Sequence, residues 1–179
     1  MQTSLQFHPA SGDAGLENIA VSVERLTPTL IQLRFTAMGN LTKIVIPPPA
    51  PPERVDGLWQ STCLELFLRR EGETGYSEFN FAPSGRWAAY CFSGYREGMM
   101  EASLPAPPAI QSLVHEGRLE VTISLHLPLD DAAYAMNLAA VIESRADGRS
   151  FWAAKHPAGE PDFHAPDCFI HQLPAAPRA

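Results

Sequence analysis

Short segments of alternating apolar and polar residues, separated by proline and glycine, are the feature that most constrains the fold of this chain. In 63–69 (CLELFLR) leucine occupies every second position, and the segments 76–81 and 87–92 follow after glycine-containing turns. Such alternation is typical of a strand with one buried face, so we predict a three-stranded meander here. With 17 Pro and 12 Gly in 179 residues, the chain is interrupted too often for a bundle of long helices.

The same pattern recurs along the rest of the chain. The further segments are 19–26, 30–35, 41–46, 110–115, 119–125 and 135–142. Periodicity alone allows 135–142 to be a helix, and its neighbours favour a strand. The proline-rich segment 47–52 is predicted to be an extended surface connection, and 116–118 (EGR) predicts a hairpin turn. Short strands at intervals of about ten residues indicate an all-β fold, an antiparallel β-sandwich of jelly-roll-like type.

Length and hydropathy predict a single domain. Hydrophobic residues make up 45% of the chain, and a domain of this size buries roughly two thirds of its unfolded surface. We expect one sandwich domain over residues 1–173 and a disordered tail over residues 174–179.

Charge and cysteine content disfavour several classes of protein. The net charge is −7 and the lysines are Lys43 and Lys155, which argues against a nucleic-acid partner, because phosphate binding needs clustered cations. Cys63, Cys91 and Cys168 form no Cys-x-x-Cys pair, so neither a disulfide framework nor a structural zinc site is indicated. The first residues do not resemble an export signal, and no apolar run is long enough to span a membrane. We expect a cytoplasmic protein without a membrane partner, and we predict no oligomeric state.

Few residue patterns indicate catalysis. The sequence contains no Gly-x-Ser-x-Gly motif and no glycine-rich phosphate loop. Glu65 and Glu78 fall on neighbouring predicted strands and could act as acid and base, but no sequence feature raises the pKa of either carboxyl. His156 and His164, with Asp162 nearby, allow a metal or haem site.

Carboxylates, amides and aromatic rings also bind sugars. Carboxylates and amides form hydrogen bonds with sugar hydroxyls, and an aromatic ring offers an apolar plane to the C–H face of the sugar. Of the three tryptophans, Trp87 lies in an alternating segment and is expected in the core. Trp59 and Trp152 lie next to loops, so either could be a sugar platform.

Two stretches of the sequence resemble a known group of proteins. The segments 58–68 (LWQSTCLELFL) and 76–81 (YSEFNF), followed by Ser84 and Gly85, resemble the family 9 carbohydrate-binding modules and the wider DOMON-like group. In that pattern a Trp precedes a strand with an acid, and an aromatic strand and a glycine turn follow. The C-terminal segments 150–153 (SFWA) and 161–169 (PDFHAPDCF) resemble the end of bacterial DOMON-like proteins that stand alone. The resemblance covers about residues 55–172.

The resemblance implies a β-sandwich that binds a sugar or a haem and carries no catalytic machinery. Trp59 and Trp152 match the rings that enclose a terminal sugar, and Glu65 matches the acid that bonds its hydroxyls. Glu78 and Asn80 match the strand with further polar contacts, although Glu78 replaces an amide of the pattern. Haem-binding relatives use a Met and a His as axial ligands, and the candidates here are Met99, Met100 and His164.

We therefore predict a non-catalytic protein that binds a carbohydrate or a sugar-like small molecule between aromatic side chains, with no cofactor and no metal. The predicted ligand-binding residues are Trp59, Glu65, Glu78, Asn80, Trp152, His156, Asp162 and His164. The alternatives are a haem- or metal-binding protein of DOMON type that uses His164, and a small hydrolase that uses the two glutamates. Without an export signal, a small sugar is a better candidate than a polysaccharide.

Overall fold

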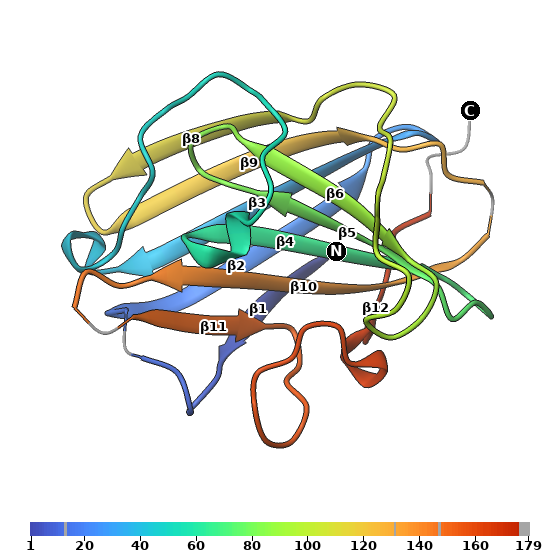
Figure 1. Ribbon diagram of the computed structural model, residues 1–179. Helices are drawn as coiled ribbons and strands as arrows, with labels where there is room; N and C mark the ends of the chain where they lie inside the picture. Colours follow the sequence, from blue (N-terminus) through green and yellow to red (C-terminus); the bar gives the residue numbers. More distant parts are fainter. Residues whose placement is uncertain (13, 131, 147, 176–179) are drawn as a thin grey trace.

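Antiparallel strands in two layers make up the chain, as the computed structural model shows for residues 1–12, 14–130, 132–146 and 148–175 (Figure 1). The first layer has the order β7-β6-β5-β4-β10-β11, and β12 pairs with β10. Its strands are β4 Cys63–Arg70, β5 Tyr76–Phe81, β6 Trp87–Phe92, β7 Met100–Glu101, β10 Tyr134–Glu143, β11 Arg149–Ala153 and β12 His171–Gln172. The second layer has the order β1-β2-β3-β9-β8. Its strands are β1 Gln2–Phe7, β2 Leu16–Arg25, β3 Leu30–Gly39, β8 Ala109–His115 and β9 Arg118–His126.

β1 joins the two layers because it pairs with β2 on one side and with β11 on the other. The sheet therefore curls from one layer into the other. The predicted class, an all-β antiparallel β-sandwich, is confirmed. The jelly-roll-like connection stays a prediction.

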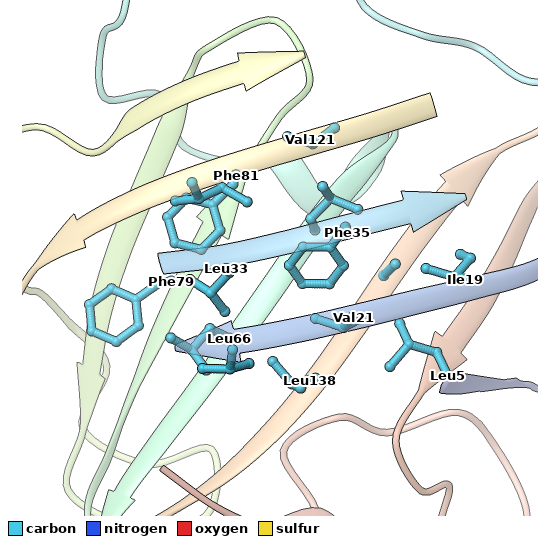
Figure 2. Close-up of a cluster of buried hydrophobic side chains, with 14 of the residues drawn as sticks. Leu5, Ile19, Val21, Leu33, Phe35, Leu66, Phe79, Phe81, Val121 and Leu138 are labelled. Atoms are coloured by element: carbon cyan, nitrogen blue, oxygen red, sulfur yellow. The ribbon is translucent and has the colours of Figure 1, made fainter. Parts of the chain in front are cut away.

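The core lies between the layers and is built from every second residue of the strands. Leu64, Leu66 and Leu68 of β4 all point inward and are buried, as the alternation predicts. Figure 2 shows how side chains from both layers meet there. The labelled members of this cluster are Leu5, Ile19, Val21, Leu33, Phe35, Leu66, Phe79, Phe81, Val121 and Leu138.

The outer face of the first layer is also buried, and this positions the site. Its side chains, which include Phe67 of β4 and Tyr90 of β6, form a second apolar cluster. Phe163 and Phe169, from the C-terminal segment 154–170 between β11 and β12, belong to the same cluster. The side-chain amide of Asn137, on β10, donates to the main-chain oxygen of Phe163 at 2.9 Å. The C-terminal segment therefore packs on the outer face of β4 and β10.

Several local predictions are confirmed and one is wrong. The segment 135–142 is a strand, and His115 pairs with Arg118 across the predicted hairpin. The predicted strand 41–46 is instead a 3₁₀ turn, Leu41–Lys43, followed by a single bridge from Ile44. The side chain of Asn40 accepts from the main-chain N–H of Thr42 at 3.1 Å, which favours the turn over the strand despite the β-branched residues.

Four strands of the described residues were not indicated by the sequence: β1, β11 and the two-residue strands β7 and β12. Residues 176–179 of the predicted tail lie outside the described residues. Within the described ranges, we find no helix with the length and apolar character that crossing a membrane requires.

Candidate ligand-binding site

A cavity of about 350 Å³ opens on the outer face of the first layer. Its volume falls within the range of small-molecule sites, about 300–1,000 Å³. Its walls come from β4, β5, β6, β10 and β11, from the 3₁₀ turn Leu58–Gln60, and from the segments after β6 and β11. The lining residues are Trp59, Glu65, Glu78, Tyr90, Phe92, Arg96, Met99, Val141, Arg149, Phe151, Pro161, Phe163 and His164.

Two buried carboxylates line this cavity. Glu65 lies on β4 and Glu78 on β5, and they are diagonal neighbours on one face because Glu65 pairs with Asn80 and Phe67 pairs with Glu78. The amide nitrogen of Asn80 donates to Glu78 Oε1 at 2.7 Å. Glu65 is only 3% exposed, and no group of the described residues forms a hydrogen bond with its buried Oε1 atom. This oxygen therefore has its hydrogen-bonding capacity free.

Burial changes the protonation of the pair. It raises the pKa of the Glu65 carboxyl well above its usual range, and the negative charge of Glu78 adds to the effect. Burial also raises the pKa of Glu78, against the opposing influence of the Asn80 hydrogen bond and the Arg96 charge. The pair therefore holds a proton more readily than two exposed carboxylates, which no sequence pattern had indicated.

His164 lies beside the pair as a neutral imidazole. Its Nδ1 is 2.7 Å from the Tyr76 hydroxyl, and its Nε2 is 3.8 Å from Glu78 Oε2. Burial, followed by the charge of Arg96, lowers the pKa of His164 to about 4. The ring packs edge-on against Phe67 and Phe92, with ring centroids 5.2 Å apart in each case. His164 therefore brings no positive charge to the cavity at neutral pH.

Aromatic rings form much of the remaining wall. Trp59 is 37% exposed and packs edge-on against Tyr90 with centroids 6.0 Å apart. The Tyr90 hydroxyl donates to Asp56 Oδ1 at 2.7 Å, which fixes that ring. Phe151 and Phe163 also pack edge-on, with centroids 6.2 Å apart. A half-exposed Trp on a fixed neighbour can pack against the apolar face of a ligand.

One ion pair and several hydrogen bonds hold the segments at the rim. Arg96 Nη2 lies 2.7 Å from Asp162 Oδ1, and the same oxygen accepts from the main-chain N–H of His164 at 3.0 Å. Arg96 has a positive φ of 56°, and its main-chain N–H donates to the Tyr76 hydroxyl at 3.2 Å. Arg149 donates to the main-chain oxygen of Trp59 at 3.3 Å. Asp162 thus connects the segment after β6 to the segment after β11.

The structure brings together most of the predicted site residues. Trp59, Glu65, Glu78 and His164 line the cavity. Asn80 is fully buried, pairs with Glu65 across the two strands and donates to Glu78, whereas Asp162 acts at the rim through Arg96. Trp87 lies in the core, as predicted.

The predicted enclosure of a ligand by Trp59 and Trp152 is not what the structure shows. Trp152 is 5% exposed and belongs to the core between the layers, where its Nε1 donates to Ser150 Oγ at 3.0 Å. Its ring lies 5.3 Å from that of Phe7. Neighbouring residues of a strand point to opposite faces, so Phe151 is the ring of β11 that lines the cavity.

His156 is also placed outside the cavity. Its Nε2 lies 2.8 Å from the main-chain oxygen of Gln6, and its ring packs edge-on against His8 with centroids 4.7 Å apart. It attaches the segment after β11 to β1. The lining residues that the sequence did not indicate are Tyr90, Phe92, Arg96, Val141, Arg149, Phe151, Pro161 and Phe163. If 149–153 had been recognised as a strand, the alternation of its side chains between the two faces would have placed Phe151 on the face opposite to Trp152.

The surroundings of His164 do not fit an axial haem ligand. Its ring lies between Phe67 and Phe92, and its nitrogens already have polar neighbours, the Tyr76 hydroxyl at 2.7 Å and Glu78 Oε2 at 3.8 Å, which disfavours a bond to iron. Of the candidate methionines, Met99 lines the cavity and Met100 does not. Within the described ranges, no three His, Cys, Asp or Glu side chains are grouped so that they could hold a metal ion.

Comparison with known proteins gives similarity at the level of the fold. No protein-family model and no curated protein matches the sequence. A solved structure from Bacteroides uniformis, described as a "putative carbohydrate-binding protein", matches with a TM-score of 0.64 and 15% identity over 84% of this chain and 75% of that chain. A carbohydrate-binding module of family 9 from Caldicellulosiruptor kristjanssonii, in complex with glucose, matches with a TM-score of 0.49 and 9% identity over 79% and 69%. The first likeness shows that this chain shares the fold of the Bacteroides protein.

Proposed function

We propose that this protein binds a sugar-like small molecule in the cavity and does not transform it. The observation that carries the proposal is the free, buried Glu65 Oε1 atom in a cavity with aromatic walls. A buried polar atom without a partner costs about 1–3 kcal/mol. A ligand hydroxyl that donates to this oxygen would offset that cost.

The walls suit a molecule with one polar edge and one apolar face. Glu65 and Glu78 can accept hydrogen bonds from hydroxyls, while Trp59 offers its half-exposed ring to a C–H face. The Bacteroides protein with this fold carries a carbohydrate-binding description, which supports the proposal by analogy of fold. A cavity of about 350 Å³ lies near the lower end of ligand sites, and we therefore propose a small sugar and not a long polysaccharide.

The placement of the two glutamates favours binding over hydrolysis. Glycosidases hold the scissile bond between two carboxyl groups that flank it. Here Glu65 and Glu78 are diagonal neighbours on one sheet face, so both approach a ligand from the same side. We therefore do not propose a hydrolase.

Calorimetric titration against a panel of neutral mono- and oligosaccharides tests the proposal. We expect one or more members to bind with micromolar to millimolar affinity. Trp59→Ala is expected to weaken binding about 2- to 12-fold, since ring stacking contributes about 0.5–1.5 kcal/mol. Leu113→Ala is a matched control, because Leu113 is exposed on β8 of the other layer. The absence of binding across the panel, or equal affinities for the Trp59→Ala variant and the wild type, would contradict the proposal.

A further inference from the structure

Neither carboxylate of the cavity is salt-bridged to a cation among the described residues, although the charge of Arg96 acts on Glu78 from a distance. In the part of the chain that the structure describes, neither Glu65 nor Glu78 forms an ion pair with a lysine or an arginine. The two arginines that line the cavity are bound elsewhere. Arg96 pairs with Asp162 at 2.7 Å, and Arg149 donates to the main-chain oxygen of Trp59.

The remaining basic group near the pair does not compensate for its charge. His164 Nε2 lies 3.8 Å from Glu78 Oε2, but burial keeps the imidazole neutral because the pKa of His164 is lowered to about 4. Asn80 donates one neutral hydrogen bond, to Glu78. Glu65, at 3% exposure, receives none at its Oε1 atom from the described residues. A buried carboxylate is either paired with a cation or a metal or it takes up a proton, and the raised pKa values of Glu65 and Glu78 show that this pair lacks sufficient compensation for its charge.

The aromatic walls of the cavity are also suited to a cation. Trp59, Tyr90, Phe92 and Phe151 all line it. The face of an aromatic ring carries negative potential, and ammonium groups are bound in pockets that combine such faces with carboxylates. Two of these rings already lie under a cation, because the guanidinium carbon of Arg54 is 5.3 Å from the Tyr90 centroid and that of Arg149 is 5.9 Å from the Phe151 centroid. Trp59, which is 37% exposed, is the ring that a ligand ammonium would use.

We infer that the ligand carries an ammonium group, which Glu65 and Glu78 bind together, so that the preferred sugar-like ligand is an amino sugar. This inference rests on the proposed function, because it names the chemical class of ligand for the same cavity. One ammonium has three N–H donors. It can therefore donate to both carboxyl groups, and its charge would stabilise their ionised forms, which burial disfavours.

Three sugars with the same ring separate the charge of the ligand from its shape. Glucosamine carries an ammonium, glucose carries a hydroxyl at that position, and N-acetylglucosamine carries a neutral amide. In calorimetric titrations at pH 6.5, where the amine is protonated, we expect glucosamine to bind about ten- to a hundredfold tighter than either neutral sugar, the range for hydrogen bonds to charged groups.

Variants then identify the residues that recognise the charge. Glu65→Gln keeps the shape of the side chain and is expected to reduce the preference for glucosamine about tenfold or more, with little change for glucose. Glu120→Gln removes the same charge from β9 of the other layer and is expected to keep the preference. If Glu65→Gln does not fold, Glu78→Gln makes the same test on the second carboxylate. Circular dichroism establishes that each variant is folded.

The outcomes distinguish this inference from the proposed function. Equal binding of glucosamine and glucose overturns the ammonium inference and leaves sugar binding in place. A preference for glucosamine that survives both glutamate substitutions also overturns it, because the carboxylates would not be the recognising groups. If neither the amino sugar nor any sugar of the neutral panel binds, the proposed function fails and this inference fails with it.

Discussion

Replacement of Trp152 by alanine separates the two tryptophans to which the sequence assigned the same role. Trp152 is 5% exposed in the core, packs on Phe7 and donates to Ser150 Oγ at 3.0 Å. Truncation of a buried Trp or Phe to Ala costs about 3–5 kcal/mol, because it removes apolar contacts and leaves a cavity. In a chain of this size 1 kcal/mol shifts the melting temperature by about 2–4 °C. We therefore expect Trp152→Ala to lower it by about 6–20 °C.

Calorimetric melting and urea denaturation measure this loss, and sugar titration well below the melting temperature measures binding. A domain stability of about 5–15 kcal/mol exceeds this loss over most of its range, and the folded Trp152→Ala variant at low temperature is expected to keep sugar affinity within about twofold of the wild type. Trp59→Ala should change the melting temperature little and weaken sugar binding, because Trp59 is 37% exposed. The reasoning is refuted if Trp152→Ala loses less than about 1 kcal/mol and weakens sugar binding as much as Trp59→Ala does.

Two further predictions concern the buried acids and thiols. Burial raises the folded-state pKa of Glu65, so its stabilising contribution is fully present below the unfolded-state pKa of about 4.3 and is lost as the pH rises toward the folded-state pKa. Urea denaturation from pH 4 to 8 should therefore show a steeper fall in the free energy of unfolding for the wild type than for Glu65→Gln, with the variant more stable at pH 7; equal slopes would contradict this. Burial also raises the pKa of the Cys63 thiol, and that of Cys168 to about 11, so a thiol reagent at pH 8 should modify the half-buried Cys91 first. Mass spectrometry identifies the modified residue, and early reaction at Cys63 would show that the outer face of β4 is open.

Alternation made the layers of the sandwich predictable from the sequence. In β4 the inward leucines Leu64, Leu66 and Leu68 repeat with period two, and this repeat belongs to strands alone. The segment 41–46 is rich in β-branched residues but begins with the 3₁₀ turn Leu41–Lys43, since a local side-chain cap at Asn40 overrides a strand preference that depends on context. β11 gave no comparable signal, because inward Trp152 and outward Phe151 are both apolar.

The acidic side chains of the candidate site and Trp59 were predictable, whereas the arginines and the other aromatic rings were not. Glu65, Glu78 and Asn80 share a face because strand register follows from the alternation itself. The position of Phe151 depends on which residues of β11 point outward, and the sequence did not indicate that β11 is a strand. That of Arg96 depends on the Asp162 ion pair between segments 66 residues apart, and no local pattern encodes such a contact.

The position of Glu65 explains how one strand contributes residues both to the core and to the ligand site. In β4 the even-numbered residues Leu64, Leu66 and Leu68 form the core, while Cys63, Glu65 and Phe67 face the outer cluster and the cavity. A glutamate among buried residues is unfavourable for folding, and a sequence selected for stability alone would place an apolar side chain there. Departures of this kind from local consistency are expected where a site is retained at the expense of stability. The Glu65→Gln variant therefore bears on both functions of the strand, because the same carboxylate that is predicted to lower stability at neutral pH is the one that we assign to the ligand.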